Sequence, residues 1–205
     1  MKHSEAVLDG VSRETRDKLQ AYMALLLRWN THINLVARRP DADLWQRHFV
    51  DSLQLLPVLP GTNGPLVDLG SGAGFPGLVL AVATGRKTHL IEADRRKCAF
   101  LQEVARVLSL PHVIIHPERI EAANPPRAAI VSARALAPLT DLLHHAHRIL
   151  AHDGVAIFPK GRAVENELTA ASVNWTMRTE RLPSCTDPAS TILRLSEICP
   201  VGAHA

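Results

Sequence analysis

The chain has 205 residues, of which 46% are hydrophobic and 21% are charged, and its formal net charge is +3. This composition excludes a disordered or fibrous chain, and the length allows one sizeable core with at most a small additional lobe. The slight positive excess is compatible with a polyanionic partner such as a nucleic acid, and an ordinary basic surface explains it equally well.

The cysteines and the N-terminal residues bear on where the protein works. Cys98, Cys185 and Cys199 are widely spaced and form no C-x-x-C pair, so we expect neither a disulfide framework nor a zinc site. Residues 1–9 lack the apolar core of a signal peptide, and no apolar run approaches the roughly 20 residues of a membrane span. We therefore expect a cytoplasmic protein that does not contact membranes.

Residues 1–60 are expected to form an N-terminal helical cap. Apolar residues recur at steps of three and four between residues 12 and 35, which predicts a first helix. A second helix is predicted over residues 41–56, because two aspartates suit its first turn. Prolines and glycines follow and indicate a loop. Residues 61–205 would form the main domain, packed with the cap as one compact unit.

The main domain alternates strands and helices, which predicts a Rossmann-like α/β fold. Its mostly parallel sheet would carry helices on both faces. The predicted strands cover residues 66–69, 88–91, 113–115, 128–132, 154–158, 175–182 and 191–195, and the predicted helices cover 76–84, 95–109, 138–150 and 163–171.

A glycine loop runs from Asp68 to Gly77, between a predicted strand and a predicted helix. Such loops bind nucleotides in α/β proteins. Gly72, Gly74 and Gly77 fit the dinucleotide pattern G-x-G-x-x-G, which would make the protein an NAD-dependent oxidoreductase. Gly70, Gly72 and Gly74, preceded by Asp68, instead fit the D-x-G-x-G-x-G loop of S-adenosylmethionine-dependent methyltransferases.

Position and charge favour the methyltransferase interpretation. A dinucleotide fingerprint should begin directly at the strand end, whereas G-x-G-x-x-G begins two residues after Gly70. Asp68 would repel a pyrophosphate but suits a cofactor that carries an ammonium and a sulfonium. Glu92 closes the next strand, 24 residues after Asp68, where a carboxylate can accept hydrogen bonds from two ribose hydroxyls. Ile120 and Glu121 follow the third strand and are candidates for an apolar and a polar contact with adenine.

Several longer motifs resemble those of a known family. They are Trp29-Asn30-x-x-x-Asn34-Leu35, Arg47-His48-Phe49-x-Asp51-Ser52-Leu53, Phe75-Pro76-Gly77 at the end of the glycine loop, Arg134-Ala135-Leu136 and Lys160-Gly161. Over nearly its whole length the chain resembles the bacterial small-subunit ribosomal RNA guanine-N7 methyltransferases of the RsmG family, also called glucose-inhibited division protein B. Beyond Arg162 the resemblance is loose. Ala133 separates Ser132 from Arg134, which weakens any role for Ser132.

This resemblance implies a class I S-adenosylmethionine-dependent methyltransferase fold, with S-adenosylmethionine as cofactor. The substrate that it implies is one guanine in small-subunit (16S) ribosomal RNA, so we expect this RNA or the 30S subunit as partner, and we expect a monomer. The cofactor contacts implied by the family are Gly70, Phe75, Ile120, Glu121 and Arg134, and they join Asp68, Gly72, Gly74 and Glu92 as the predicted cofactor-binding residues.

Methyl transfer to guanine N7 requires side chains that align the reacting atoms but none that removes a proton. The enzyme must hold nucleophile, methyl carbon and sulfur in a row, and the N7 lone pair is free at neutral pH, so no general base is needed. We therefore assign no catalytic residue. Arg134 is a candidate for substrate positioning, by packing against the cofactor or by offering its fork to guanine O6 or a phosphate; a structural ion pair is the alternative. Lys160 either meets RNA phosphate or is a solvated lysine.

Basic residues supply the remaining candidates. Arg95, Arg96 and Lys97 open a helix, where the helix dipole disfavours positive charge, so they indicate either an anionic partner or a solvated face. With Arg47, His48 and Lys160 they form the candidate RNA-binding set.

Two further expectations concern metals and competing functions. His144, His145 and His147 lack a carboxylate or cysteine that would complete a metal site, so no metal is expected. A non-catalytic ribosome- or RNA-binding module is the alternative beside the oxidoreductase.

Overall fold

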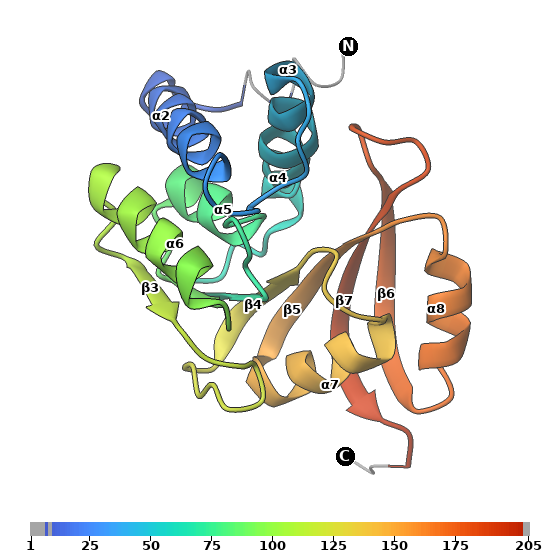
Figure 1. Cartoon of the computed structure of the whole chain (residues 1–205). Helices are drawn as coiled ribbons and strands as arrows, with labels where there is room; N and C mark the ends of the chain where they lie inside the picture. Colours follow the sequence, from blue (N-terminus) through green and yellow to red (C-terminus); the bar gives the residue numbers. More distant parts are fainter. Residues whose placement is uncertain (1–6, 8–9, 203–205) are drawn as a thin grey trace.

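A seven-stranded sheet organises the protein, with strand order β3-β2-β1-β4-β5-β7-β6 (Figure 1). The computed structural model describes residue 7 and residues 10–202, so residues 1–6, 8–9 and 203–205 of the predicted cap and main domain lie outside the described residues. The first five strands pair in parallel, and β7 pairs antiparallel with both β5 and β6. The strands are β1 (Leu66–Leu69), β2 (Thr88–Ile91), β3 (Val113–His116), β4 (Ala128–Ala133), β5 (Leu150–Lys160), β6 (Trp175–Pro183) and β7 (Thr191–Pro200).

Helices cover both faces of the sheet, as the alternating pattern predicts. Helices α5 (Gly77–Thr84) and α6 (Arg95–Val107) lie on one face, and α2 (Arg13–Asn30) packs over them as a further layer (Figure 1). Helices α7 (Leu139–Ile149) and α8 (Val164–Ala171) pack against the other face. Helix α5 is apolar on every side because it lies between the sheet and the N-terminal helices.

The second helix of the predicted cap runs without a break from residue 41 to residue 53, so the prediction of a helix over residues 41–56 is confirmed except for its last turn, and the helix is not α-helical throughout. It is divided into α3 (Asp41–Leu44), the π-helical segment η1 (Trp45–Val50) and α4 (Asp51–Leu53), followed by the 3₁₀ turn η2 (Leu56–Val58). A π-helical turn inserts residues into the helical repeat, so it rotates the side chains that follow. Phe49 and Val50, the last two residues of this segment, are buried in the core.

Gly77 allows α5 to start directly against the side chain of Asp68 on β1. A Cβ at position 77 would lie 2.4 Å from the Asp68 Cβ. We expect Gly77→Ala to lower the free energy of unfolding by about 3 kcal/mol, because neither the sheet nor the helix can yield cheaply. Urea denaturation followed by circular dichroism measures the change.

Gly61→Ala is the matched control, since a Cβ at position 61 would meet nothing within 4 Å. It should change the unfolding free energy by no more than about 0.5 kcal/mol. Equal effects of the two substitutions would contradict the packing described for α5.

Among residues 10–202, no helix is long and apolar enough to cross a bilayer.

Candidate active site

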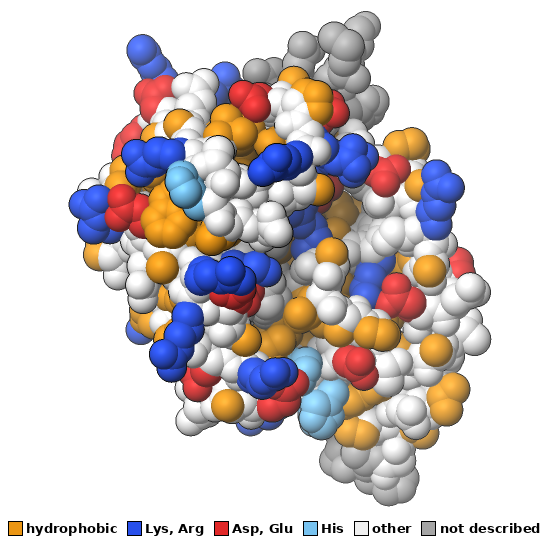
Figure 2. Space-filling model, viewed as in Figure 1, with side chains coloured by type: hydrophobic (Ala, Val, Ile, Leu, Met, Phe, Trp, Pro, Cys, Tyr) orange, Lys and Arg blue, Asp and Glu red, His pale blue; other side chains and the backbone are white. Residues whose placement is uncertain are grey.

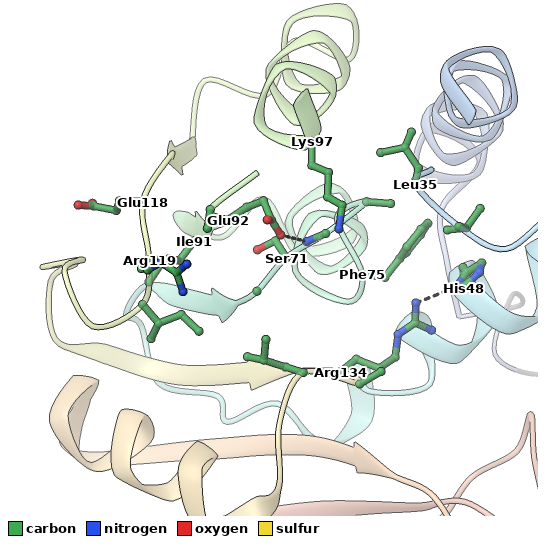
Figure 3. Close-up of a pocket in the computed structure, with 18 of the residues that line it drawn as sticks. Leu35, His48, Ser71, Phe75, Ile91, Glu92, Lys97, Glu118, Arg119 and Arg134 are labelled. Atoms are coloured by element: carbon green, nitrogen blue, oxygen red, sulfur yellow. Dashed lines mark hydrogen bonds between the residues drawn. The ribbon is translucent and has the colours of Figure 1, made fainter. Parts of the chain in front are cut away.

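A cavity of about 540 Å³ lies at the carboxyl edge of the parallel strands. Its wall is formed by the glycine loop after β1, the segment after β2, the segment after β3 and the loop after β4 (Figure 3). Side chains at the carboxyl ends of neighbouring parallel strands converge on one edge of the sheet, which is where open α/β sheets bind ligands. The volume falls in the range of small-molecule sites.

The glycine loop is held open toward this cavity. Gly70 and Gly72 adopt left-handed backbone angles, with φ of 59° and 58°. A Cβ at Gly70 would strike Leu136, whereas a Cβ at Gly72 would find nothing closer than the Gly70 carbonyl oxygen at 3.8 Å. The Ser71 amide donates to the Ile91 carbonyl at 3.0 Å, which ties the loop to β2. Space beside Gly72 is therefore available to a ligand.

Glu92 crosses from the end of β2 to the glycine loop. Its two carboxylate oxygens accept hydrogen bonds from the backbone amides of Gly72 and Asp94, each at 2.8 Å. A carboxylate offers about four lone-pair sites, so both oxygens can accept further donors such as hydroxyl groups. The Gly72 amide, which a bound phosphate would use, is already occupied by a carboxylate. This arrangement disfavours a pyrophosphate on the loop.

Asp68 lies behind the loop and does not line the cavity. Its side chain is fully buried, and the Ser132 hydroxyl donates to one carboxylate oxygen at 2.6 Å. Asp68 is therefore not placed to contact a cofactor ammonium in the cavity, as the sequence had led us to expect. It instead joins β1 to β4. Burial raises the pKa of Asp68 from 3.8 to about 6, against the lowering effect of its hydrogen bonds. The inserted Ala133 made a role for Ser132 unexpected, but Ser132 has a structural one, since it holds Asp68 through this hydrogen bond.

The raised pKa of Asp68 predicts a pH-dependent stability. A carboxyl group with a raised folded-state pKa stabilises the protein below its unfolded pKa and loses that contribution as the pH rises through the folded value, here between about 4 and 6. Compared with Asp68→Asn, the wild type should lose about 2–3 kcal/mol of unfolding free energy between pH 4 and pH 7. Urea titrations of both proteins at several pH values test this; a pH-independent difference between them would contradict the prediction.

The predicted cofactor-binding residues divide into two groups. Gly74 is also buried away from the cavity, where a Cβ would strike the Tyr22 hydroxyl. Tyr22 donates a hydrogen bond to the Ala73 carbonyl and so fastens α2 to the loop. The predicted residues that line the cavity are Gly70, Gly72, Phe75, Glu92, Ile120, Glu121 and Arg134.

Phe75 is fixed by rings from the N-terminal helices. His48 stacks on it with centroids 4.8 Å apart, Tyr22 stacks at 5.5 Å, and Phe49 meets it edge-on at 5.2 Å. The Arg134 guanidinium lies 5.3 Å from the Phe75 ring centroid. Offset and edge-on ring contacts and a cation near a ring are each favourable, so this cluster holds the cavity wall rigidly.

Arg134 is clamped to the N-terminal helices by three contacts. Its Nη1 donates to the Arg47 carbonyl at 2.7 Å and to the Asp51 carboxylate at 3.0 Å. Its Nη2 lies 2.7 Å from His48 Nδ1 (Figure 3). Arg134 therefore forms a structural ion pair, which was the alternative to a role in substrate positioning. Its side chain also lines the cavity. Most of its donors are committed within the protein.

A second, larger cavity of about 1190 Å³ adjoins the first. The two share one wall, formed by His48, Arg134, Ala135 and Leu136. Positive side chains that line the larger cavity are Arg39, Arg47, Arg134, Lys160 and Arg162, and carboxylates that line it are Asp43, Asp51, Glu167 and Asp187. We call the shared wall the junction.

Lys160 is less available for contact with an RNA phosphate than the sequence suggested. Its ammonium lies 2.7 Å from the Glu167 carboxylate and 3.0 Å from the Ala137 carbonyl oxygen, and 9% of the side chain is exposed. This ion pair holds the loop after β4 against α8. Lys160 still lines the larger cavity, but its charge is largely compensated there.

The loop between β6 and β7 closes the far side of the larger cavity. Thr186 donates to Asp51 at 2.5 Å, and the Cys185 amide donates to the Gln54 side chain at 2.8 Å. These contacts join segments more than 130 residues apart. Asp51 is therefore shared by Arg134 and the loop, a role that no local sequence pattern indicated.

The remaining basic candidates are not brought together. Lys97 lines the first cavity, whereas Arg95 is exposed outside both cavities and Arg96 pairs with Asp94 at 3.2 Å. Figure 2 shows Lys and Arg side chains on either side of the hollow that lies between the N-terminal helices and the sheet.

The histidines of α7 are dispersed. His147 Nδ1 lies 2.8 Å from the Ile198 carbonyl oxygen, His145 lies 3.8 Å from Glu121, and His144 is exposed. No group of three or more His, Cys, Asp or Glu side chains within the described part of the chain could hold a metal ion.

The sequence matches, over residues 15–192, a family described as "rRNA small subunit methyltransferase G". It is 58% identical over 193 residues to the Ribosomal RNA small subunit methyltransferase G of Rhodospirillum centenum, which covers 94% of this chain and 89% of that protein. It is 53% identical over 192 residues to the protein of the same name from Granulibacter bethesdensis, with 94% and 90% covered.

Solved structures show the same fold. The ribosomal protein L11 methylase of Lactobacillus delbrueckii subsp. bulgaricus superposes with a TM-score of 0.59 at 14% identity, covering 73% of this chain and 78% of that one. A TehB-like SAM-dependent methyltransferase from Corynebacterium glutamicum gives 0.55 at 14% identity, covering 71% and 86%. The predicted Rossmann-like class I methyltransferase fold is confirmed.

Proposed function

Because the chain belongs to the rRNA small subunit methyltransferase G family, we propose that it methylates N7 of one guanine in small-subunit (16S) ribosomal RNA, with S-adenosylmethionine as methyl donor. The observation that carries this proposal is the junction, where a cavity of cofactor size meets a larger cavity that arginines line together with carboxylates. A methyl donor in the first cavity and a base in the second would meet at His48 and Arg134.

The residues of the first cavity fit S-adenosylmethionine, which supplies an electrophilic methyl group on a sulfonium. Glu92 has lone pairs left for ribose hydroxyls, and Ile91 and Ile120 offer apolar surface to a flat adenine. Because Gly72 has no side chain, the space beside it is free for the amino-acid part of the cofactor. A pyrophosphate would compete with Glu92 for the Gly72 amide, which speaks against the oxidoreductase alternative.

The junction lacks a group that could remove a proton. Of the side chains that line both cavities, only His48 and Arg134 are polar. The guanidinium has no lone pair to offer, and His48 Nδ1 already faces the Arg134 donor at 2.7 Å. Asp51 is engaged by Arg134 and Thr186. A nucleophile at the junction must therefore supply its own lone pair, as guanine N7 does.

Bound S-adenosylmethionine would supply the methyl group and keep the electron pair of the carbon–sulfur bond. N7 of guanine would bond to the methyl carbon with its own lone pair, which would leave a 7-methylguanine cation. The protein has to align the atoms rather than move a proton, which a rigid wall of Phe75, His48 and Arg134 accomplishes.

The larger cavity is the proposed RNA side of the site. Arg39, Arg47 and Arg162 line it, and guanidinium groups suit phosphate recognition. We infer that the assembled 30S subunit or its RNA is the partner, that the protein acts as a monomer, and that it works in the cytoplasm.

Transfer of labelled methyl groups tests the proposal. Purified protein is incubated with labelled S-adenosylmethionine and small subunits from a strain that lacks this family's enzyme, beside small subunits from its parent and large subunits. We expect label only in small subunits from the deficient strain. RNA binding without label would favour the non-catalytic module, and micromolar binding of NADH with none of S-adenosylhomocysteine would favour the oxidoreductase.

A further inference from the structure

The tautomer of His48 is determined by its contact with Arg134. Arg134 Nη2 lies 2.7 Å from His48 Nδ1. A guanidinium has only donors, so Nδ1 must be the acceptor in this hydrogen bond. A neutral imidazole whose Nδ1 accepts carries its proton on Nε2. His48 therefore presents an N–H donor on the opposite edge of its ring.

The surroundings of His48 keep this donor neutral and oriented. The ring stacks on Phe75 with an interplanar angle of 21°. Burial, followed by the positive charges of Arg134, Arg47 and Arg39, lowers the pKa of the imidazole from 6.5 to about 4. At physiological pH the ring is thus an uncharged donor held by two neighbours, rather than an acid or a base.

The Nε2 nitrogen is open to a ligand. It makes no hydrogen bond to another described residue, and it is not among the buried polar atoms that lack a partner. His48 lines both cavities, so this free N–H is a donor on one of the two polar side chains of the junction. Arg134 is a poorer candidate for contacting a base there, because its Nη1 and Nη2 groups already bond to Arg47, Asp51 and His48.

We propose that the Nε2–H group of His48 donates a hydrogen bond to O6 of the target guanine and so selects guanine over purines that carry a 6-amino group. This inference rests on the proposed function. Guanine presents N7 and O6 as neighbouring acceptors on one edge, whereas adenine presents a donor beside N7. A donor aimed at O6 leaves the N7 lone pair free for the methyl carbon, and a 6-amino group would place two donors face to face.

The test compares purines at the methylated position. After that position is mapped, small subunits are reconstituted with RNA that carries guanine, inosine or 2,6-diaminopurine there; the last keeps N7 but replaces O6 with an amino group. We expect the wild type to use guanine and inosine with similar kcat/KM and diaminopurine at least about 30-fold less well.

His48→Phe should keep the ring on Phe75 and remove the donor. We expect its kcat/KM for guanine to fall about 10- to 100-fold, mainly through KM, while the value for diaminopurine stays within about threefold. The preference for guanine would then nearly vanish, and His48→Gln, which retains an N–H donor, should restore part of it. Binding of S-adenosylhomocysteine and thermal unfolding verify that the variants are folded.

An unchanged guanine preference in His48→Phe would overturn the inference while leaving the proposed function intact; absence of any guanine methylation by the wild type would overturn the proposed function itself. Nitrogen-15 NMR of labelled histidine in the wild-type protein adds a test that needs no variant. It should report a proton on Nε2 and none on Nδ1, and the reverse tautomer would also overturn the inference.

Discussion

Replacing Gly72 with asparagine is expected to weaken the binding of S-adenosylhomocysteine by about 100-fold or more. Gly72 has a φ of 58°, and a side chain there would extend into open space beside the loop in the first cavity. The added atoms would occupy the volume that the cofactor needs. Isothermal titration calorimetry measures the affinity of wild type and variant.

Gly85→Asn controls for the strained backbone. Gly85 ends α5 with a φ of 66°, a Cβ there would meet nothing within 4 Å, and Gly85 lines neither cavity. Both variants should therefore lose a similar amount of stability, about 1 kcal/mol, because asparagine tolerates the left-handed region. Only Gly72→Asn should lose the ligand. Equal affinities in the two variants would mean that the cofactor lies elsewhere.

Arg134→Ala is expected to reduce kcat/KM for methyl transfer by about 100-fold or more. The substitution removes the ion pair with Asp51, the hydrogen bond to His48 and the cation beside Phe75. It therefore releases the loop after β4 from the N-terminal helices, so the two sides of the junction are no longer held together. A small misplacement of reacting groups is enough for such a loss. Steady-state kinetics on small subunits measure it.

Arg194→Ala is the matched control for Arg134→Ala. Arg194 also joins a backbone carbonyl, that of Val58 at 3.1 Å, and a carboxylate, Glu180 at 2.8 Å, but it lines neither cavity. Its loss should lower stability and leave kcat/KM within about threefold. If both arginine variants lost activity in proportion to their lost stability, Arg134 would have no specific role at the site.

A combination of Arg134→Ala with Asp51→Asn probes their coupling. The pair is 3.0 Å apart, and the two side chains are 17% and 16% exposed. Residues that act through one contact show non-additive effects, so the double variant should be little worse than Arg134→Ala alone.

The sheet and the cofactor side of the site follow from local sequence. Strands buried on both faces give short apolar runs, and the residues that close them, Glu92 above all, must lie at one edge of a parallel sheet. The spacing of the glycines between a predicted strand and a predicted helix then identifies the loop. The glycine motif predicted Gly72 as a cofactor-binding residue, and the family resemblance implied Gly70 and Phe75; all three line the cavity.

The face of the sheet toward which the Asp68 side chain points could not be predicted from the sequence in the same way. Side chains alternate between the two faces of a strand, and Asp68 points toward α5, where only the glycine at position 77 leaves space for it. A sequence pattern records that an acidic residue is present at a strand end. It does not record that Ser132, 64 residues later, supplies the hydrogen bond that keeps it there.

The larger cavity depends on contacts between distant segments. Arg134 meets Asp51 across 83 residues, and Thr186 meets the same carboxylate across 135. The π-helical turn that orients this part of the N-terminal helices has no periodic signal of its own. Such tertiary contacts override local patterns. The sequence therefore identified the motif around Arg47 and Asp51 but did not predict which distant residues its side chains contact.

Digestion of 16S RNA to nucleosides, followed by mass spectrometry, tests most directly whether the junction delivers a methyl group to guanine N7. Small subunits from a strain that lacks the family's enzyme are treated with the protein and S-adenosylmethionine, and with Gly72→Asn in parallel. We expect one additional 7-methylguanosine per subunit with the wild type and almost none with the variant. A methyl group on another atom or base, or no gain of 7-methylguanosine, would contradict this account of the site.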